Sequence, residues 1–147
     1  MLSLLILNGP NLNLLGQRQP EVYGSTTLAD VEATCQSLAK SRGVSLSFVQ
    51  SNHEGVLIDE IHNAKGSHSG IILNAGALTH TSIGLMDAIS SVEVPVIEVH
   101  LSNIHARESF RSRSCISAVA VGQIVGLKWR GYLAALEILV EQIKEQE

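Results

Sequence analysis

This sequence has few charged residues, few aromatic residues and no long hydrophobic run. Charged residues make up 16% of its 147 positions and aromatic residues 3%, and the net charge is −4. Without a basic run or a row of aromatic residues, the chain has little that would bind nucleic acid or an anionic membrane. Hydrophobic residues make up 45%, so we expect other copies of the chain to cover part of the surface. The composition therefore predicts a homo-oligomer that acts on a small molecule.

Cysteine is scarce as well, and nothing indicates export or insertion into a membrane. Leu4 to Leu7, the longest strongly apolar stretch, is far shorter than the roughly 20 residues that a membrane helix needs, and no basic segment precedes it. Cys35 and Cys115 form no CxxC pair, which suits a reducing compartment. We expect a soluble, cytoplasmic protein with two free thiols, in which residues 1–147 form a single catalytic domain.

Five short apolar runs are nearly continuous rather than alternating, which is typical of strands buried on both faces of a parallel sheet. They cover residues 2–7, 44–49, 70–73, 94–99 and 118–121. Between and after them, apolar residues recur three and four positions apart, which predicts helices. Thr27 with Asp30 is typical of a helix N-cap, and Gly43 is well placed to end that helix. The fold class expected is α/β, a flavodoxin-like doubly wound five-stranded parallel sheet flanked by helices.

Polar residues gather in the loops that should follow the strands, where open parallel sheets bind their ligands. The expected loops are residues 8–24, 50–54, 74–82, 100–113 and 122–126. Arg18 and Tyr23 favour a polar ligand for the first loop over asparagines that only form turns. The third loop offers Asn74 and His80 before a helix N-terminus, where anions are favoured. A simple helix cap at Thr81 or Ser82 explains the hydroxyl groups there equally well.

A possible general acid ends the fourth predicted strand. Residues two apart point to the same face of a strand, so Glu98 can hold His100. A carboxylate on one imidazole nitrogen favours the charged, proton-donating form of the ring. A histidine that merely closes the strand is the alternative. In the loop that follows, we favour Arg111 as the receptor for a substrate carboxylate, because a planar guanidinium binds carboxylates through two hydrogen bonds.

Other chemistries find little support in the residues. The four lysines fall within or at the ends of helical periods rather than in the sheet-end loops, so a Schiff-base mechanism lacks its amine. The histidines have neither helical ligand spacing nor a nearby cysteine, so no metal site is expected. Neither GxxxxGK[ST] nor GxGxxG occurs, and the first loop lacks the residues that cradle a flavin phosphate. We therefore expect no cofactor.

Several segments, in this order along nearly the whole chain, closely resemble type II 3-dehydroquinate dehydratase. They are Asn8-Gly9-Pro10-Asn11-Leu12-Asn13-Leu14-Leu15-Gly16, Arg18, Tyr23-Gly24, Gln50-Ser51-Asn52, Asn74-Ala75-Gly76, Glu98-Val99-His100-Leu101-Ser102-Asn103 and Gly122-Gln123-Ile124-Val125-Gly126. The resemblance implies a cofactor-independent hydro-lyase that converts 3-dehydroquinate to 3-dehydroshikimate by trans elimination through an enolate. This is the third step of the shikimate pathway to chorismate and aromatic amino acids, and in some organisms the same reaction serves quinate breakdown. The resemblance also implies a homododecamer of four trimers.

The resemblance further implies roles for individual residues. Tyr23 would be the base that removes a proton beside the substrate ketone, and Arg18 would hold Tyr23 ionised. Asn11 would hold a water that stabilises the enolate. His100, oriented by Glu98, would protonate the departing hydroxyl. The implied substrate-binding groups are Asn74, His80, Arg111 and the backbone at Leu101 and Ser102, together with Asp87, which would reach into the site of a neighbouring subunit.

A tyrosine base is energetically reasonable in this setting. An unperturbed tyrosine titrates near pH ~10, so a phenolate at neutral pH needs roughly three pH units of stabilisation, or about 4 kcal/mol. One cation about 4 Å away supplies roughly that much at an effective dielectric constant of about 20. Arg18 alone is therefore nearly sufficient, whereas burial without it would favour the neutral phenol.

The sequence departs from the pattern of the resembled family at three positions. Gln19 replaces the glutamate of the family's Arg-Glu-Pro, which puts in question how the first loop, a mobile-lid candidate, is held closed. Cys115 and Ala118 stand where an aromatic residue and a proline are common, which should alter packing or subunit contacts. Two other functions stay open, a flavodoxin-like small-ligand binding module without catalysis and, among enzymes, a metal hydrolase.

Overall fold

The computed structural model describes residues 2–147, except for the side chain of Tyr23. Five parallel strands form one sheet in the order β2-β1-β3-β4-β5. The strands are β1 (Ser3–Asn8), β2 (Ser45–Gln50), β3 (Gly70–Asn74), β4 (Val96–His100) and β5 (Gly122–Val125). The predicted flavodoxin-like α/β fold is therefore confirmed.

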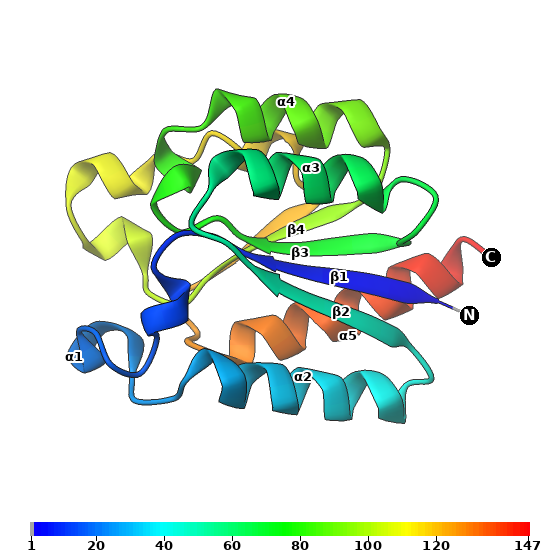
Figure 1. Cartoon of the computed structure of the whole chain (residues 1–147), viewed down its shortest axis with the longest axis horizontal. Coiled ribbons are helices and arrows are strands. Elements are labelled where there is room, and N and C mark those ends of the chain that lie inside the picture. Colours follow the sequence, from blue (N-terminus) through cyan, green and yellow to red (C-terminus); the bar gives the residue numbers. More distant parts are fainter. Residues whose placement is uncertain (1) are drawn as a thin grey trace.

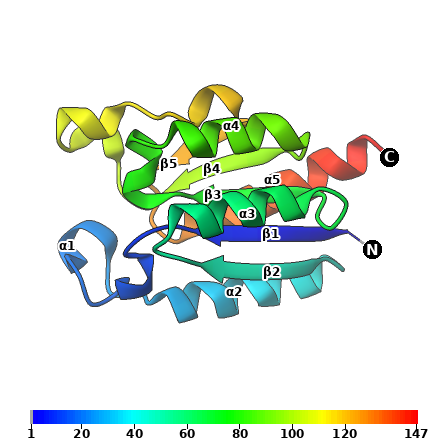
Figure 2. The same cartoon turned by 45° about the horizontal axis from the view of Figure 1, so that its top comes forward.

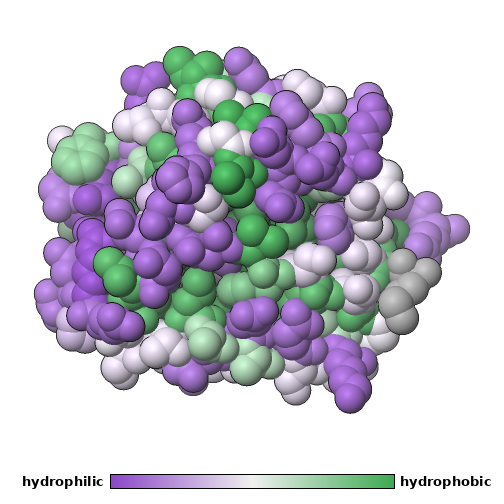
Figure 3. All heavy atoms as spheres, in the orientation of Figure 1, coloured by the Kyte–Doolittle hydropathy of each residue, from purple (hydrophilic) through white to green (hydrophobic). Residues whose placement is uncertain are grey.

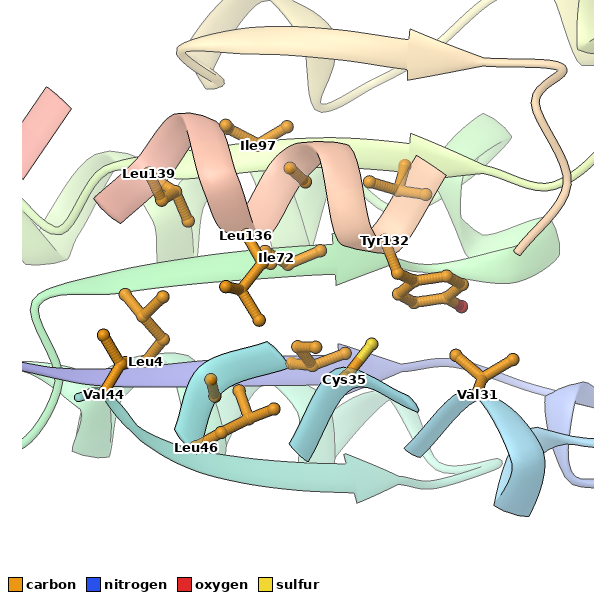
Figure 4. Packing of buried hydrophobic residues seen from close by; sticks show 14 of the residues in the cluster. Leu4, Val31, Cys35, Val44, Leu46, Ile72, Ile97, Tyr132, Leu136 and Leu139 are labelled. Atoms are coloured by element: carbon orange, nitrogen blue, oxygen red, sulfur yellow. The ribbon is translucent and has the colours of Figure 1, made fainter. Parts of the chain in front are cut away.

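Helices cover both faces of the sheet (Figures 1 and 2). On one face lie α2 (Leu28–Ser41) and α5 (Arg130–Glu145), and on the other α3 (Glu54–Ala64) and α4 (Ile83–Val92). A hydrophobic cluster fills the space on each side of the sheet, and Figure 4 shows the cluster beneath α2 and α5. Shorter helices occupy the loops: α1 (Pro20–Tyr23), η1 (Leu12–Leu14), η2 (Gly76–His80), η3 (Ile104–Ala106), η4 (Ser109–Ser112) and η5 (Ser117–Val119).

The first long helix begins and ends where the sequence predicts. The Thr27 hydroxyl accepts a hydrogen bond from the Asp30 backbone N–H at 3.1 Å, and the Asp30 carboxylate accepts one from the Thr27 N–H at 3.1 Å. This reciprocal pair satisfies donors that the first turn of a helix leaves free. After the helix, Gly43 adopts a φ of +69°, which glycine reaches without strain.

The fifth strand does not lie where the sequence predicts it. Residues 117–119 form the 3-10 turn η5, which overlaps the predicted strand at 118–121, and β5 occupies Gly122–Val125 in a segment expected to be a loop. β5 is an edge strand whose first two residues are exposed, so its residues need not be apolar. The apolar run that predicts the fifth strand therefore lies in the segment just before β5. The true register places Gln123 beside Glu98 of β4.

The loops after the strands gather at one end of the molecule, while β1 begins and α5 ends at the other (Figure 1). The surface in Figure 3 has hydrophobic side chains among the hydrophilic ones. Within residues 2–147, no helix is both long and apolar enough to cross a membrane. The large hydrophobic side chains found exposed are Leu14, Val56, Ile83, Phe110, Val121, Leu127 and Ile138.

We predict that Gly9→Ala destabilises the protein by about 1–3 kcal/mol, the usual cost of overpacking. The Gly9 N–H donates to the Asn74 carbonyl at 2.8 Å, so the ends of β1 and β3 lie close together. A Cβ at Gly9 would lie 2.4 Å from the Ala75 carbonyl oxygen and would force the two loops apart. Urea unfolding measures the change.

The matched control is Gly55→Ala in α3, where an added Cβ meets nothing within 4 Å. We expect this change to stabilise the helix by about 0.5–1 kcal/mol. Equal effects of the two substitutions would contradict the close approach at Gly9.

Candidate active site

A pocket opens beyond the carboxyl ends of β1, β3 and β4, where three loops meet. It is lined by Pro10, Asn11, Leu12, Leu14, Leu15, Arg18, Asn74, Gly76, Ala77, His80, His100, Leu101, Ser102, Ile104, Arg107 and Arg111. Most of the site residues predicted from the sequence are therefore brought together, although they come from distant parts of the chain.

Of the predicted residues whose side chains are described, two are not among those that line the pocket. Glu98 is fully buried behind His100 and contacts it directly. Asp87 is exposed on α4, away from the lining residues of its own chain. Tyr23 is the last residue of α1, and its side chain lies outside the described residues.

Glu98 and His100 form a buried pair at the end of β4. Nε2 of His100 is hydrogen-bonded to Oε2 of Glu98, and the two side chains are 5% and 0% exposed. Burial by itself would raise the pKa of Glu98, but the hydrogen bonds from His100, Gln123 and Ser114, with the charge of His100, outweigh it. The pKa of this carboxyl therefore lies below its usual value, so Glu98 carries its negative charge beside the His100 ring.

Two residues that the sequence analysis missed help to hold this carboxylate. The Ser114 hydroxyl donates to Oε2 of Glu98 at 2.9 Å, and Nε2 of Gln123 donates to the same oxygen at 3.0 Å. Gln123 belongs to a motif that we quoted, but placing it in a loop hid its contact with β4. Ser114 carried no local signal. Oε1 of Glu98 is buried and has no hydrogen-bond partner in the described part of the chain, so one oxygen takes all three donors.

His80 offers a second imidazole to the pocket. Its Nδ1 lies 2.7 Å from the Arg113 carbonyl oxygen, and because a carbonyl only accepts, Nδ1 carries the proton. Nε2 is then the atom left for a ligand. The ring stacks beside His100, with 6.3 Å between the centroids and 20° between the planes. The loop after β3 thus presents an imidazole of fixed tautomer next to the proposed acid.

The first loop holds Asn11 in an unusual backbone conformation. Asn11 has a φ of +68°, in the left-handed region that asparagine tolerates better than most residues. Its backbone N–H donates to Oδ1 of Asn52 at 2.9 Å. Nε2 of Gln50 donates to the same oxygen at 3.1 Å and to the Gly9 carbonyl at 3.2 Å. The end of β2 therefore fixes the backbone that presents Asn11 to the pocket.

The arginine-rich segment after β4 supplies cations at the pocket wall. Nε of Arg111 donates to the carboxylate of Glu108, whose pKa is lowered mainly by this bond. Because Glu108 is exposed, this ion pair is weak and a ligand carboxylate can replace it. Arg107, which we had not singled out, donates from Nη1 to the Ser102 hydroxyl at 3.2 Å.

The prediction that all four lysines lie outside the loops at the carboxyl ends of the strands is wrong for one of them. Lys128 follows β5, so it lies in a loop at the carboxyl end of the sheet rather than outside such loops. Its backbone N–H donates to the Leu101 carbonyl at 2.9 Å. Lys128 is not among the residues that line the pocket. Among residues 2–147, no group of three or more His, Cys, Asp or Glu side chains is placed to hold a metal ion.

The sequence holds two tyrosines, and one of them is unsuited to act as a base. Tyr132 on α5 is fully buried. Burial raises the pKa of its phenol well above the usual value, because an apolar surrounding disfavours the anion. A phenolate in this protein therefore has to come from Tyr23.

Comparison with known proteins identifies the family. Residues 2–140 match the model of the family described as dehydroquinase class II. The chain belongs to the class II dehydroquinase family. It is 62% identical over 146 residues to a 3-dehydroquinate dehydratase of Ruegeria pomeroyi, with 99% of this chain and 98% of that relative covered. It is 54% identical over 144 residues to the catabolic 3-dehydroquinase 1 of Neosartorya fischeri, with 98% and 96% covered.

Solved structures agree with this family assignment. The type II dehydroquinase of Butyrivibrio crossotus matches with a TM-score of 0.92 at 41% identity, covering 94% of this chain and 97% of that one. The family predicted from the sequence is therefore confirmed, and with it the enzyme class, a hydro-lyase that acts on a carbon–oxygen bond. The flavodoxin-like binding module and the metal hydrolase are both set aside.

We predict that Glu98→Gln destabilises this dehydroquinase by about 1–3 kcal/mol near neutral pH, the cost of losing hydrogen bonds to a buried charge. A carboxyl whose pKa is lowered by folding stabilises the protein above its unfolded pKa, and this contribution is lost as the pH falls through the folded pKa. The stability difference between wild type and variant should therefore shrink below the ordinary pKa of 4.5. Unfolding by urea at a series of pH values measures it.

Glu108→Gln is the matched control, because this carboxylate is exposed and its ion pair is screened by solvent. It should change stability little at any pH. A difference for Glu98→Gln that stays constant down to acid pH would contradict an ionised, buried Glu98.

Proposed function

We propose that the pocket removes water from 3-dehydroquinate by trans elimination through an enolate, giving 3-dehydroshikimate in the shikimate pathway. The observation that carries this proposal is the meeting of the first loop with the Glu98–His100 pair around one pocket. Trans elimination needs a base on one side of the substrate and an acid on the other. The first loop supplies the base, and the end of β4 supplies the acid.

The acid is His100. Its Nε2 is engaged by Glu98, so Nδ1 is the nitrogen that can give a proton to the departing hydroxyl. Ser114 and Gln123 hold the Glu98 carboxylate, so the imidazole keeps its orientation when it becomes neutral. A positioned acid of this kind contributes about 10²- to 10⁴-fold to a rate.

The base is Tyr23, and Arg18 stabilises its phenolate. Arg18 lines the pocket and lies in the same loop as α1, which Tyr23 ends. Tyr132 is too deeply buried to serve as an anion. After the proton leaves the carbon beside the ketone, Asn11 holds the water that stabilises the enolate oxygen. The left-handed backbone of Asn11, fixed by Asn52, places this amide before the substrate arrives.

The substrate's hydroxyl and carboxylate groups are bound by the remaining walls. Asn74 and Nε2 of His80 take hydroxyl groups, and Arg111 with the backbone of Leu101 and Ser102 takes the carboxylate, which displaces Glu108 from the guanidinium. All of these groups except Glu108 line the pocket. No cofactor takes part in this scheme, because each proton has a donor or acceptor in the protein.

The direct test mixes the purified chain with 3-dehydroquinate and follows the ultraviolet absorbance of the conjugated product. Absorbance should rise at the same rate before and after treatment with a chelator. A folded oligomer that gives no rise would refute the proposed reaction, and loss of activity on chelation would refute its independence from metal.

We predict that Tyr23→Phe lowers kcat by at least about 10²-fold while leaving substrate affinity largely intact, because only the proton acceptor is removed. Single-turnover kinetics and calorimetric titration measure the two effects. Substantial turnover by this variant would refute Tyr23 as the base.

The companion variant Arg18→Ala keeps the phenol but removes the nearby cation. Its rate profile should shift to higher pH, so that the rate is far below wild type near neutral pH and recovers as the pH rises, because an unassisted tyrosine ionises only near pH ~10. A profile that keeps the wild-type shape would assign the activation of Tyr23 to another group.

We also propose that the chain acts as a dodecamer of four trimers in the cytoplasm, with Asp87 completing the site of a neighbouring subunit. The exposed position of Asp87 on α4, apart from the pocket of its own chain, supports this placement. Exposed hydrophobic residues such as Ile83 and Leu127 provide surface for subunit contacts. Both cysteines are free thiols, as suits a reducing compartment.

We predict that two inactive variants, Asp87→Ala and His100→Ala, regain activity when they are dissociated and reassembled together. In an equal mixture, about one quarter of the shared sites combine an intact His100 with an intact Asp87 from the next subunit. The product assay and the solution mass of the assemblies measure the outcome. Mixed assemblies without recovered activity, or a fully active monomer, would contradict a shared site.

A further inference from the structure

Behind the pocket, a chain of four hydrogen bonds joins three strands through α5. The Gly76 N–H donates to Oδ1 of Asn74 at 3.2 Å, and Nδ2 of Asn74 donates to the Tyr132 hydroxyl at 2.9 Å. The Tyr132 hydroxyl donates to Oδ1 of Asn8 at 2.7 Å, and Nδ2 of Asn8 donates to the Val49 carbonyl at 3.1 Å. Of these residues, Asn74 and Gly76 line the pocket.

These four hydrogen bonds can run in one direction only, because the groups at the two ends of the series are backbone groups. The Val49 carbonyl only accepts, so the atom of Asn8 that faces it must be the nitrogen, and Oδ1 must face Tyr132. The hydroxyl has a single proton, which goes to Asn8, so it must accept from Asn74. At the other end the Gly76 N–H only donates, so it meets Oδ1 of Asn74. Each amide orientation therefore follows from the one before it.

The two central bonds of these four, from Asn74 to the Tyr132 hydroxyl and from that hydroxyl to Asn8, are buried. Asn8 and Tyr132 are 0% exposed and Asn74 is 3% exposed. Figure 4 shows the Tyr132 ring between α5 and the sheet, with its hydroxyl toward the end where the strands' arrowheads lie. Burial also keeps the phenol protonated by raising its pKa. The hydroxyl thus stays a donor to Asn8 at neutral pH.

We propose that Tyr132 is a positioning residue for the dehydration reaction, which sets the orientation of the Asn74 amide that the substrate meets. Oδ1 of Asn74 is engaged by Gly76 and one N–H by Tyr132, so the second N–H is left for the pocket. The site therefore selects a substrate that offers an oxygen acceptor, such as a hydroxyl, at this point. This proposal rests on the proposed function, since it concerns how the same pocket recognises 3-dehydroquinate.

The principal experiment is Tyr132→Phe, which removes the hydroxyl and keeps the ring. The KM for 3-dehydroquinate should rise about three- to tenfold while kcat changes less than about twofold, because an oriented hydrogen bond present in ground and transition states is lost. In an Asn74→Ala background, Tyr132→Phe should have no further effect on KM, because its effect passes through that amide.

Leu139→Val is the matched control on the same helix, since Leu139 is also fully buried in the cluster around Tyr132. It should lower stability to urea without changing KM. A structural role for Tyr132 would make the two variants alike and would make the effects of Tyr132→Phe and Asn74→Ala multiply. Either result would overturn the proposal.

A second pair of variants tests Asn8, at the end of the hydrogen-bond series that does not touch the pocket. In Asn8→Leu the Tyr132 proton loses its acceptor and turns toward Asn74, so KM should rise as in Tyr132→Phe. Burial keeps the carboxyl of Asn8→Asp protonated, so it can donate to the Val49 carbonyl and accept from Tyr132, and KM should stay within about twofold of wild type. Equal KM values for the two variants would overturn the proposal even if Tyr132→Phe fails to fold.

Different outcomes refute the proposed function and the positioning role of Tyr132. A folded wild-type enzyme without turnover of 3-dehydroquinate would refute the proposed function, and the positioning role with it. An active wild type whose KM is unmoved by Tyr132→Phe and Asn8→Leu would refute the positioning role alone.

Discussion

The central strands of this sheet end in polar side chains that are almost completely buried, and the site is built around the need to give them partners. Asn8, Asn74 and Glu98 are at most 3% exposed, and an unpaired polar group in such a place costs about 1–3 kcal/mol. Their partners come from α5, β5 and the segment before η5, with Tyr132, Gln123 and Ser114 supplying the bonds. Folding and assembly of the pocket are therefore the same event.

Two kinds of network meet at the pocket, and they act differently. The network around Glu98 is charged, with three donors on one oxygen, so it holds a negative charge beside His100. The network through Tyr132 is neutral and contains only amides and one hydroxyl, so it moves no proton and fixes direction instead. In the proposed reaction, recognition and proton transfer thus rest on separate groups, and each can be altered without the other.

The sequence predicted the parts of the fold that follow from local pattern. The buried strands β1, β3 and β4 are nearly continuous apolar runs, and the Thr27 cap and the Gly43 stop are short-range signals. β5 was misplaced because an edge strand needs no apolar run. Glu98 and His100 could be paired because two residues on one strand share a face. Tyr132 could not be linked to the site, because it bonds Asn8 across 124 positions of sequence and its spacing on α5 is that of a core residue.

The two ends of the chain bear on how the protein can be joined to others. β1 begins and α5 ends at the end of the molecule opposite the pocket loops (Figure 1). A tether attached at either end would therefore leave the mouth of the pocket unobstructed within its own subunit. The same arrangement offers a route to circular permutation, because a short linker between the ends would leave the pocket loops intact and a new start could be placed in the turn between α3 and β3.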